Sequence, residues 1–334
     1  MAVGNTDYDT FLSSTQRKRR PGLVSSLIDQ QALWWQLSRR GLLREESGGH
    51  AVTVPLLYGD NSTVSSFSGY DTLDNTPQAG MTTAVFDWKY IAASTSISGQ
   101  EVSENQGSAE RIFNLLEAKM KQTEVSLKKD LNVQTLSDGT GNGGKDITGL
   151  AIAVEDGTGW ATYGNIDRSD ALNTFWRNQW FNFDTIYGGS STFGQASGSS
   201  TKGIAAIRKM YGLCDRDGER PSLILTPSDL LEAYESNIEG DKQRIVDTKM
   251  ADAGFSNLTY KGVPIVRDED VTAENMIFLN SNHLKISALK GQNFHSTPFQ
   301  TPVNQHAKVS HTIWGGNLTC DRPNVQGRIT LFSI

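Results

Sequence analysis

The stretch that decides the fold runs from Gly48 to Leu136 and begins with His50-Ala51-Val52-Thr53-Val54-Pro55-Leu56-Leu57-Tyr58. A polar run follows at Asn61–Gly80, and β character returns at Thr82–Ser98. A helical pattern then begins at Ser108 and continues to Leu136. A two-stranded excursion of this length cannot bury enough of its own surface to be stable alone. The sequence therefore predicts a segment that lies on a partner, and a second copy of the same chain is the expected partner.

The two periodic segments predict which side chains are packed. Thr82–Ser98 alternates along its length, and we expect Phe86, Trp88, Tyr90 and Ala92 to share the packed apolar face. The helix carries one apolar stripe at steps of three or four residues. The stripe consists of Ile112, Leu116, Met120, Thr123, Leu127 and Leu131. The run Ser137–Gly144 ends the helix.

Outside this stretch the pattern predicts an alternation of helices and strands. We expect helices at Leu23–Leu43, Ser169–Trp180, Thr201–Cys214 and Pro227–Tyr234. We expect strands at Ile147–Val154, Arg220–Thr226, Tyr260–Asp268, Met276–Leu279, Leu284–Leu289 and in the tail from Val309 to Ile334. The fold class is therefore α+β.

The composition is that of a folded protein with a basic N-terminal arm. The 334 residues include seven tryptophans and only two cysteines, Cys214 and Cys320, which are too far apart in sequence to suggest a disulfide framework or a zinc site. No signal peptide or membrane-spanning run is evident, so we expect a soluble chain made in a reducing cytoplasm. The net charge is −6; residues 1–44 contain seven Arg or Lys and three Asp, which is +4, and leave −10 for the rest. Such an arm suits acidic surfaces of neighbouring subunits or nucleic acid.

No motif for catalysis or metal binding is found. The five histidines lack an HExxH pattern or paired carboxylates, and Gly194–Gly198 lacks the GxSxG spacing of a nucleophile elbow. Asp215–Glu219 fails the EF-hand pattern because Arg220 stands where the loop needs glycine. We therefore expect no enzyme, no cofactor and no metal site.

The order of these elements resembles the major capsid proteins of tailed bacteriophages, which have the HK97-type fold. The likeness covers the chain from about residue 45 to the end. It rests on the Val52–Ser98 excursion, which resembles the extended E-loop, and on Ser108–Leu136, which resembles the spine helix. Further stretches that carry it are Gly164-Asn165-Ile166-Asp167-Arg168-Ser169 with Trp176, Pro221–Pro227 and Lys261–Asp268.

The resemblance implies a division of the chain into five parts. They are an N-terminal arm at 1–47, an E-loop at 48–88, a peripheral domain with the spine helix (about 108–136) at 89–145, an axial mixed α/β domain at 146–300, and a return to the peripheral domain at 301–334. It also implies a virion shell of pentamers and hexamers, assembled in the bacterial cytoplasm, with the E-loop across the neighbouring subunit. Expected partners are a portal, a decoration protein, and packaged DNA held without sequence-specific contacts and away from any membrane.

Two departures from the family sharpen this expectation. Some members join their subunits by an isopeptide bond from an E-loop lysine, but no lysine occurs here between Lys18 and Lys89, so we expect a non-covalent shell. About 45 residues precede the E-loop, too few for a fused scaffolding domain, so we expect a separate scaffolding protein.

The candidate subunit contacts come from the arm, the E-loop and the spine helix, with one residue from the axial domain. They are Arg17, Lys18, Arg19, Arg20, Trp34, Trp35, Tyr58, Phe67, Tyr70, Glu110, Glu117, Lys121 and Arg168. Two alternatives to the phage shell stay open. One is an encapsulin-type nanocompartment, and the other is a cytoplasmic ligand-binding protein or enzyme with a site near Asp167, Arg168 and Asp215.

Overall fold

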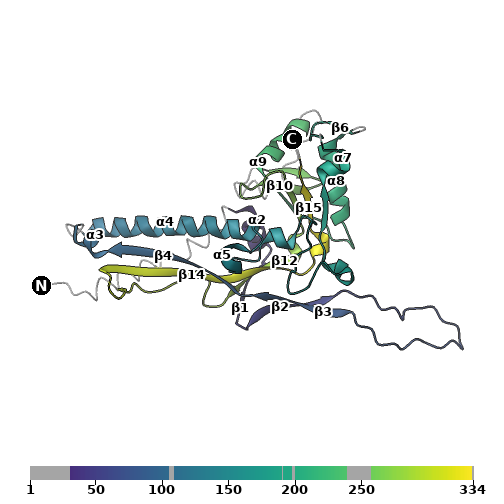
Figure 1. Ribbon diagram of the computed structural model, residues 1–334, viewed down its shortest axis with the longest axis horizontal. Helices are drawn as coiled ribbons and strands as arrows, with labels where there is room; N and C mark the ends of the chain where they lie inside the picture. Colours follow the sequence, from purple (N-terminus) through teal and green to yellow (C-terminus); the bar gives the residue numbers. More distant parts are fainter. Residues whose placement is uncertain (1–30, 105–108, 190, 198–199, 239–256, 333–334) are drawn as a thin grey trace.

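Two β-sheets, one long helix and one projecting hairpin make up the molecule (Figure 1). The computed structural model describes residues 31–104, 109–189, 191–197, 200–238 and 257–332. The long helix and one sheet form an extended body from which the hairpin projects, and the second sheet stands beside the body as a separate lobe (Figure 1). We call these parts the body and the lobe.

The body is built on a five-stranded sheet. Its strands are β1 (Leu43–Glu46), β4 (Lys89–Ser98), β12 (Leu284–Leu289), β13 (His295–Ser296) and β14 (Ala307–Cys320). The path is β1-β12-β14-β13, and β4 pairs with β14 in antiparallel register from Ser98↔Ala307 to Lys89↔Gly316. Helix α4 (Ala109–Leu136) lies along β4, as expected for a helix with one apolar stripe. Leu116, Met120, Leu127 and Leu131 of that stripe are buried.

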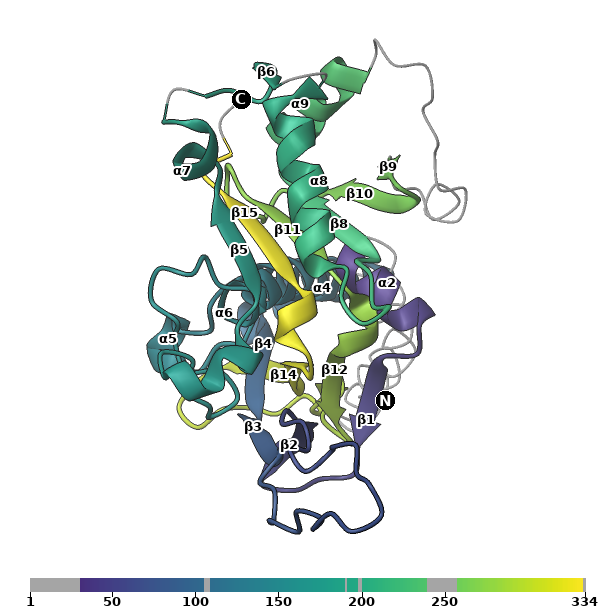
Figure 2. The ribbon, with the colours of Figure 1, turned by 90° about the vertical axis from the view of Figure 1, so that its right-hand side faces the viewer.

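The lobe is built on a six-stranded sheet with the order β5-β15-β11-β8-β10-β9. The strands are β5 (Gln179–Asn182), β8 (Leu223–Thr226), β9 (Asn257–Tyr260), β10 (Val263–Arg267), β11 (Met276–Leu279) and β15 (Gly327–Thr330). Helix α8 (Lys202–Cys214) packs across β5, β15 and β11, and α9 (Ser228–Ile238) packs on β10 (Figure 2). Every residue of β8 and β11 is buried, so these strands form the centre of the lobe.

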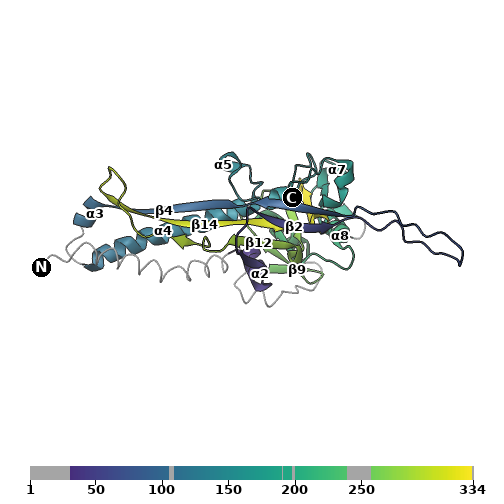
Figure 3. The ribbon, with the colours of Figure 1, turned by 90° about the horizontal axis from the view of Figure 1, so that it is seen from below.

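The hairpin consists of β2 (Ala51–Leu57) and β3 (Met81–Asp87), paired antiparallel from Ala51↔Asp87 to Leu57↔Met81. Residues 58–80 connect the two strands without helix or strand. The hairpin leaves the body at the end opposite to α3 (Gly99–Glu104) and extends beyond the rest of the molecule (Figure 3). The remaining short elements are α2 (Ala32–Arg39), α5 (Gly141–Gly144), α6 (Leu150–Ala153), η1 (Ala171–Trp176), α7 (Phe183–Tyr187), β6 (Ala196–Ser197), β7 (Ser200–Thr201), η2 (Ser281–His283) and η3 (Pro323–Val325).

Within the described residues the chain passes between body and lobe three times, and the second and third crossovers are tied together. One leads from β11 through η2 to β12, and the other leads from β14 through η3 to β15. The Gln326 side chain accepts a hydrogen bond from Asn280 N (2.7 Å) and donates one to Asn280 O (3.1 Å). His283 Nδ1 lies 2.7 Å from Asp321 Oδ1. These contacts fix the lobe to the body.

Several expectations from the sequence are wrong in detail. The helix expected at Ser169–Trp180 is only the 3-10 helix η1, and Gln179 and Trp180 belong to β5. The single strand expected at Tyr260–Asp268 is divided at Lys261 and Gly262, because Tyr260 ends β9 and β10 begins at Val263.

The helix expected at Leu23–Leu43 ends at Arg39, and Leu43 begins β1 instead; its expected start lies outside the described residues. Gly41, at φ +68°, closes the helix because its N–H reaches Ser38 O and the next N–H reaches Leu37 O. The strand expected at Ile147–Val154 is the short helix α6, because Ala151 N bonds to Ser137 O at the end of α4 and Val154 N to Leu150 O.

A further correction concerns the strand expected at Thr82–Ser98. Ala84 and Phe86 are buried in β3, but Ile91, Thr95 and Ile97 are the buried residues of β4. The packed face therefore changes from even to odd positions at Trp88. The cause is a change of partner, because β3 pairs with β2 and β4 pairs with β14. Trp88, Tyr90 and Ala92 are not on the buried face.

The sheets also divide the chain differently from the expected domain ranges. Strand β12, inside the range 146–300, pairs with β14 in the body. Strand β15, inside 301–334, lies between β5 and β11 in the lobe. Strand β1, inside the expected arm at 1–47, pairs in parallel with β12. The chain thus returns from the lobe to the body between β11 and β12, before the expected boundary at 300, and it enters the lobe again between β14 and β15.

Candidate assembly surface

The apolar side chains exposed to solvent gather on the hairpin. Among the described residues, half of the exposed large apolar side chains lie between positions 57 and 81. They are Leu57, Tyr58, Val64, Phe67, Tyr70, Leu73 and Met81. Phe67 is 68% exposed and Met81 is 81% exposed. Soluble chains rarely leave apolar side chains clustered in water unless a partner covers them, so the hairpin is the candidate assembly surface.

The charge of the hairpin is of one sign. Residues 48–88 contain Asp60, Asp71, Asp74 and Asp87 and no Lys or Arg. A hydrogen bond from the Thr76 hydroxyl, joined by one from its backbone N–H, lowers the pKa of Asp74. The surface therefore combines aromatic groups with stable negative charge, and a complementary partner surface is apolar with positive charge around it.

The base of the hairpin is anchored by aromatic contacts with the body. Phe86 packs edge-on against Tyr163, with ring centroids 5.1 Å apart, and Tyr163 stacks on Trp176 at 5.8 Å. Tyr58 stacks on Phe175 at 4.4 Å and is the outermost of these contacts. The anchored base thus ends near Tyr58, and the residues beyond it carry the exposed apolar groups.

Gly164 brings the hairpin close to the body. Its carbonyl accepts a hydrogen bond from Val85 N at 2.9 Å. Its φ is +59°, and a Cβ at this position would stand 2.9 Å from the Cβ of Ala84. Glycine is therefore required here both for the backbone conformation and for the close approach.

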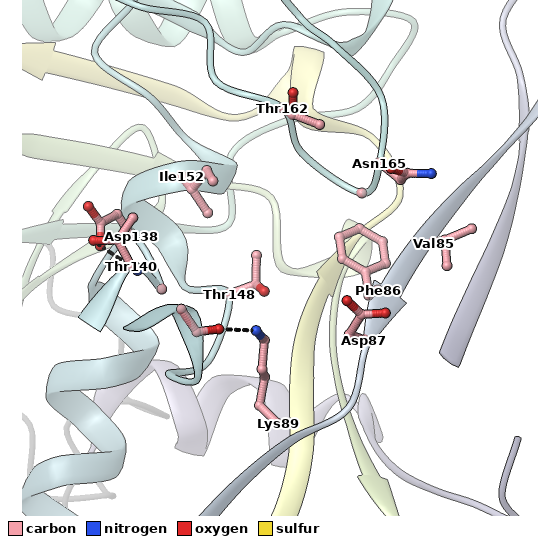
Figure 4. Close-up of a pocket in the computed structure, with 13 residues that line it drawn as sticks. Val85, Phe86, Asp87, Lys89, Asp138, Thr140, Thr148, Ile152, Thr162 and Asn165 are labelled. Carbon is pink, nitrogen blue, oxygen red and sulfur yellow. Dashed lines mark hydrogen bonds between the residues drawn. The ribbon is translucent and has the colours of Figure 1, made fainter. Parts of the chain in front are cut away.

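A cavity of about 670 Å³ lies beside the hairpin base (Figure 4). The junction of β3 and β4 forms one side, with Phe86, Asp87 and Lys89. The loops around 138–144, 148–152 and 162–165 contribute the other lining residues. The Lys89 ammonium donates to Gly144 O, as the dashed line in Figure 4 shows. The cavity thus separates the hairpin base from the loops that follow α4.

The predicted contact residues of the hairpin and of α4 differ in how far their side chains are exposed to solvent. Phe67 and Tyr70 are exposed on the hairpin, and Lys121 is exposed on α4. Glu117 is half-buried on α4. Glu110 belongs to α4, but its side chain lies outside the described residues.

The predicted contacts of the N-terminal region are only partly described. Arg17, Lys18, Arg19 and Arg20 lie outside the described residues. Trp34 is 3% exposed and packs edge-on against Trp314, so it belongs to the core and is not a subunit contact. Trp35 is half-buried, with the Arg39 guanidinium 5.1 Å from its ring centroid.

Arg168 is also wrong as a subunit contact, because its side chain is fully buried. It donates to Ala161 O at 2.8 Å and to Ile152 O at 2.6 Å, and it forms an ion pair with Glu155 at 2.9 Å. Burial lowers the pKa of its guanidinium. These bonds give Arg168 a structural role, in which it joins α6 to the loop that supports the hairpin.

The alternative ligand site near Asp167, Arg168 and Asp215 finds no support in these contacts. Asp167 accepts hydrogen bonds from the backbone N–H and hydroxyl of Ser169, and Asp215 pairs with Arg220 at 3.4 Å. Within the described ranges, no group of three or more His, Cys, Asp or Glu is arranged to hold a metal ion. No helix in the same ranges is long and apolar enough to cross a membrane.

Several residues of the candidate surface were not predicted from the sequence. Leu57, Val64, Leu73 and Met81 are exposed apolar residues beside the predicted aromatics. Their signal was present, because Val64 and Leu73 are apolar residues within a polar loop, and Leu57 and Met81 lie at the ends of the two expected β segments. Asn317, which bonds to the hairpin base, had no signal beyond its place in a strand.

Comparisons with known proteins place this arrangement in a known fold. No protein-family model and no curated protein matches the chain. Solved structures do match. The capsid asymmetric unit of cyanophage A-1(L) is 16% identical, with a TM-score of 0.61 over 88% of this chain and 91% of that one. The capsid of a native GTA particle is 13% identical, with a TM-score of 0.55 over 89% and 90%.

A non-viral shell has the same architecture. The SrpI encapsulin of Synechococcus elongatus PCC 7942 is 9% identical, with a TM-score of 0.53 over 91% of this chain and 88% of that one. At these identities the likeness establishes the fold and nothing finer. The chain has the HK97-type capsid fold, as expected from the sequence.

Proposed function

We propose that this chain is the major capsid protein of a tailed bacteriophage, which assembles through pentamers and hexamers into an icosahedral shell around double-stranded DNA. The observation that carries the proposal is the apolar hairpin, whose side chains Val64, Phe67, Tyr70 and Leu73 beyond the anchored base are exposed to solvent. Burial of one Phe, Leu or Met side chain stabilises by about 1.5–3 kcal/mol. Several such side chains per subunit, repeated over a closed shell, offset the entropic cost of association.

In this proposal the hairpin acts as the E-loop and lies across the neighbouring subunit, while α4 acts as the spine helix. The shell is held without covalent bonds, since residues 48–88 contain no lysine that could supply an amine. A denaturing gel of intact particles tests this part, because a ladder of covalent oligomers would contradict it.

The other proposed partners follow from the fold and the charge. A separate scaffolding protein directs assembly, a portal and a decoration protein complete the particle, and DNA is packaged without sequence-specific contacts. The acidic balance outside residues 1–44 suits an inner wall that does not trap DNA. The basic residues Arg17–Arg20 bridge subunits or bind scaffold, and neutral substitution of all four is expected to impair assembly.

A second candidate is the shell of an encapsulin-type nanocompartment, which encloses protein cargo. The similarity to the SrpI encapsulin favours it, because its TM-score of 0.53 lies close to the 0.55 of the GTA capsid. The two candidates differ in how they assemble. A nanocompartment is expected to close from this chain alone, whereas the phage capsid is expected to need its scaffolding protein for shells of uniform size.

Electron microscopy of the material that pellets at high speed after expression of this chain tests the proposal. Shells, tubes or curved sheets support a shell subunit, and closed uniform shells without any partner favour the nanocompartment. If only monomer is found, co-expression with the proposed scaffolding protein is the second arm. Failure to form particles in both arms would overturn the proposed function.

A further inference from the structure

The point where the hairpin leaves the body is held by a side chain. The antiparallel ladder between β4 and β14 ends at the pair Lys89↔Gly316. The next residue of β14, Asn317, pairs through its backbone with Ser287 of β12 on the other side. On the side of the departing strand its carboxamide replaces the missing ladder, because Asn317 Nδ2 donates to Asp87 O at 2.8 Å.

Asn317 uses its full bonding capacity at this point. Besides Asp87 O, its Nδ2 reaches Thr148 Oγ1 at 3.2 Å. Its Oδ1 accepts from Thr148 N at 3.0 Å and from Leu318 N at 2.9 Å. An asparagine carboxamide offers two donors and two acceptor positions, and here all are occupied in a fully buried residue. Asn317 therefore joins three segments at one point: the hairpin base, the loop before α6, and β14.

Lys89 makes a second connection close to the first. Its ammonium spans to Gly144 O, so it links the start of β4 to the loop that follows α4 (Figure 4). The cavity of about 670 Å³ is lined by Lys89 and Gly144 as well as by Asp87 and Thr148, two of the residues that Asn317 holds. The hairpin base is thus held by Asn317 and by Lys89. The cavity lies between the hairpin base and the loops that follow α4, so the hairpin has space to tilt towards these loops.

We propose that Asn317 and Lys89 set the angle at which the β2–β3 hairpin leaves the body, and through this angle the curvature of the shell. The consequence for curvature rests on the proposed function. Strands of seven residues span about 23 Å, so a tilt of about 10° at the base moves the far end by about 4 Å. A displacement of that size, at the surface that contacts the neighbour, changes the angle between two subunits. Asn317 and Lys89 are positioning residues in this proposal, since neither belongs to the exposed apolar surface.

The first experiment measures the angle in the unassembled protein. Spin labels are placed on cysteines introduced at Ser66 in the hairpin and Ser126 on α4, both exposed, while the native Cys214 and Cys320 are buried and remain unlabelled. Lys89→Met removes the hydrogen bond to Gly144 O without burying a charge, and Lys89→Arg is the matched control because it retains a donor for Gly144 O. We expect a shifted and broader label-to-label distance distribution for Lys89→Met and a distribution like that of the parent chain for Lys89→Arg.

The second experiment measures curvature in assembled particles. Lys89→Met is expected to shift the distribution of particle diameters. The control Lys89→Arg is expected to give the same distribution as the parent chain. Asn317→Ala is expected to shift the label distances further than Lys89→Met, with circular dichroism as the check that it is folded.

The two experiments distinguish a failure of the angle-setting role from a failure of the proposed function. Identical label distances in the parent, Lys89→Met and folded Asn317→Ala would overturn the angle-setting role, whether or not particles form. Altered distances with unchanged particle diameters would overturn the link to curvature. If the parent chain forms no particles with its scaffolding protein, the proposed function fails, and the label distances still decide whether these residues set the angle.

Discussion

The hairpin and the six-stranded sheet of the lobe are both built from short strands, but they bury their side chains in opposite ways. All residues of β8 and β11 are buried, whereas β2 and β3 bury only Leu56, Ala84 and Phe86. The lobe completes its packing within the chain, through α8 and α9. The hairpin leaves its apolar groups exposed to solvent, so in the proposed function the lobe supplies the stability of the monomer and the hairpin supplies the affinity between subunits.

The largest expected effect tests the lobe. Phe278 in β11 is fully buried in the lobe core, and Phe278→Ala is expected to lower the free energy of unfolding by about 3–5 kcal/mol because it leaves a cavity. Urea denaturation of the monomer measures this loss. A change below about 1 kcal/mol would show that the lobe core collapses around the missing ring, and it would weaken the contrast between the two regions.

The next effect concerns the crossovers between lobe and body. Burial raises the pKa of Asp321, but hydrogen bonds with His283 and Lys285 outweigh it and hold the pKa below its ordinary value. The hydrogen bond from Asn280 is the main cause of the lowered pKa of Glu219. A lowered pKa in the folded state means that this stability is present above the ordinary carboxyl pKa of about 4 and is lost as the pH falls through the lowered values.

Asp321→Asn tests this acid dependence. It removes a hydrogen bond to a charged group and is expected to cost about 1.5–3 kcal/mol at pH 7. Because the variant has no carboxylate to protonate, its unfolding free energy is expected to fall less steeply than that of the parent between about pH 5 and pH 2. Parallel pH profiles of the two proteins, measured by thermal unfolding, would contradict this assignment.

A smaller change in the free energy of unfolding, this time a gain in stability, is expected on substitution of Asp268, which follows β10 in the lobe. Burial raises the pKa of Asp268, so its charge destabilises the folded state above that pKa. Asp268→Asn retains an oxygen that can accept from Asn132 Nδ2 and Asp270 N. The variant is expected to be more stable by about 1 kcal/mol at pH 7, with a difference that shrinks as the pH falls. A loss of stability at pH 7 would show that the charge is compensated in the fold.

The smallest effect on unfolding is expected on the hairpin itself. The double variant Phe67→Ser and Tyr70→Ser is expected to change the free energy of unfolding of the monomer by less than about 0.5 kcal/mol. The same variant is expected to abolish particle formation, whereas the matched control Ser65→Ala and Ser66→Ala in the same loop is expected to assemble. If the aromatic double variant forms normal particles, the hairpin is not part of the assembly surface.

The sequence was informative where a pattern reports local packing. The helical stripe from Leu116 to Leu131 predicted α4, and the apolar runs at Met276–Leu279 and Leu284–Leu289 coincide with β11 and β12. The change of packed face at Trp88 was not predictable, because it depends on β14, more than 200 positions later. Arg168 was wrongly predicted as a subunit contact, and Asn317 was not predicted at all, for a related reason. The burial of a polar residue depends on partners that only the fold brings together.

The lack of basic residues in the hairpin has a consequence for proteolysis. No Lys or Arg occurs between Arg44 and Lys89, so trypsin-like proteases have no cleavage site in the most exposed segment of the described chain. Chymotrypsin-like proteases, which cleave after aromatic residues, find Phe67 and Tyr70 in the open. Unassembled subunits should therefore be cut there by the second class of protease and spared by the first, and protection of these two positions would report docking of the hairpin directly.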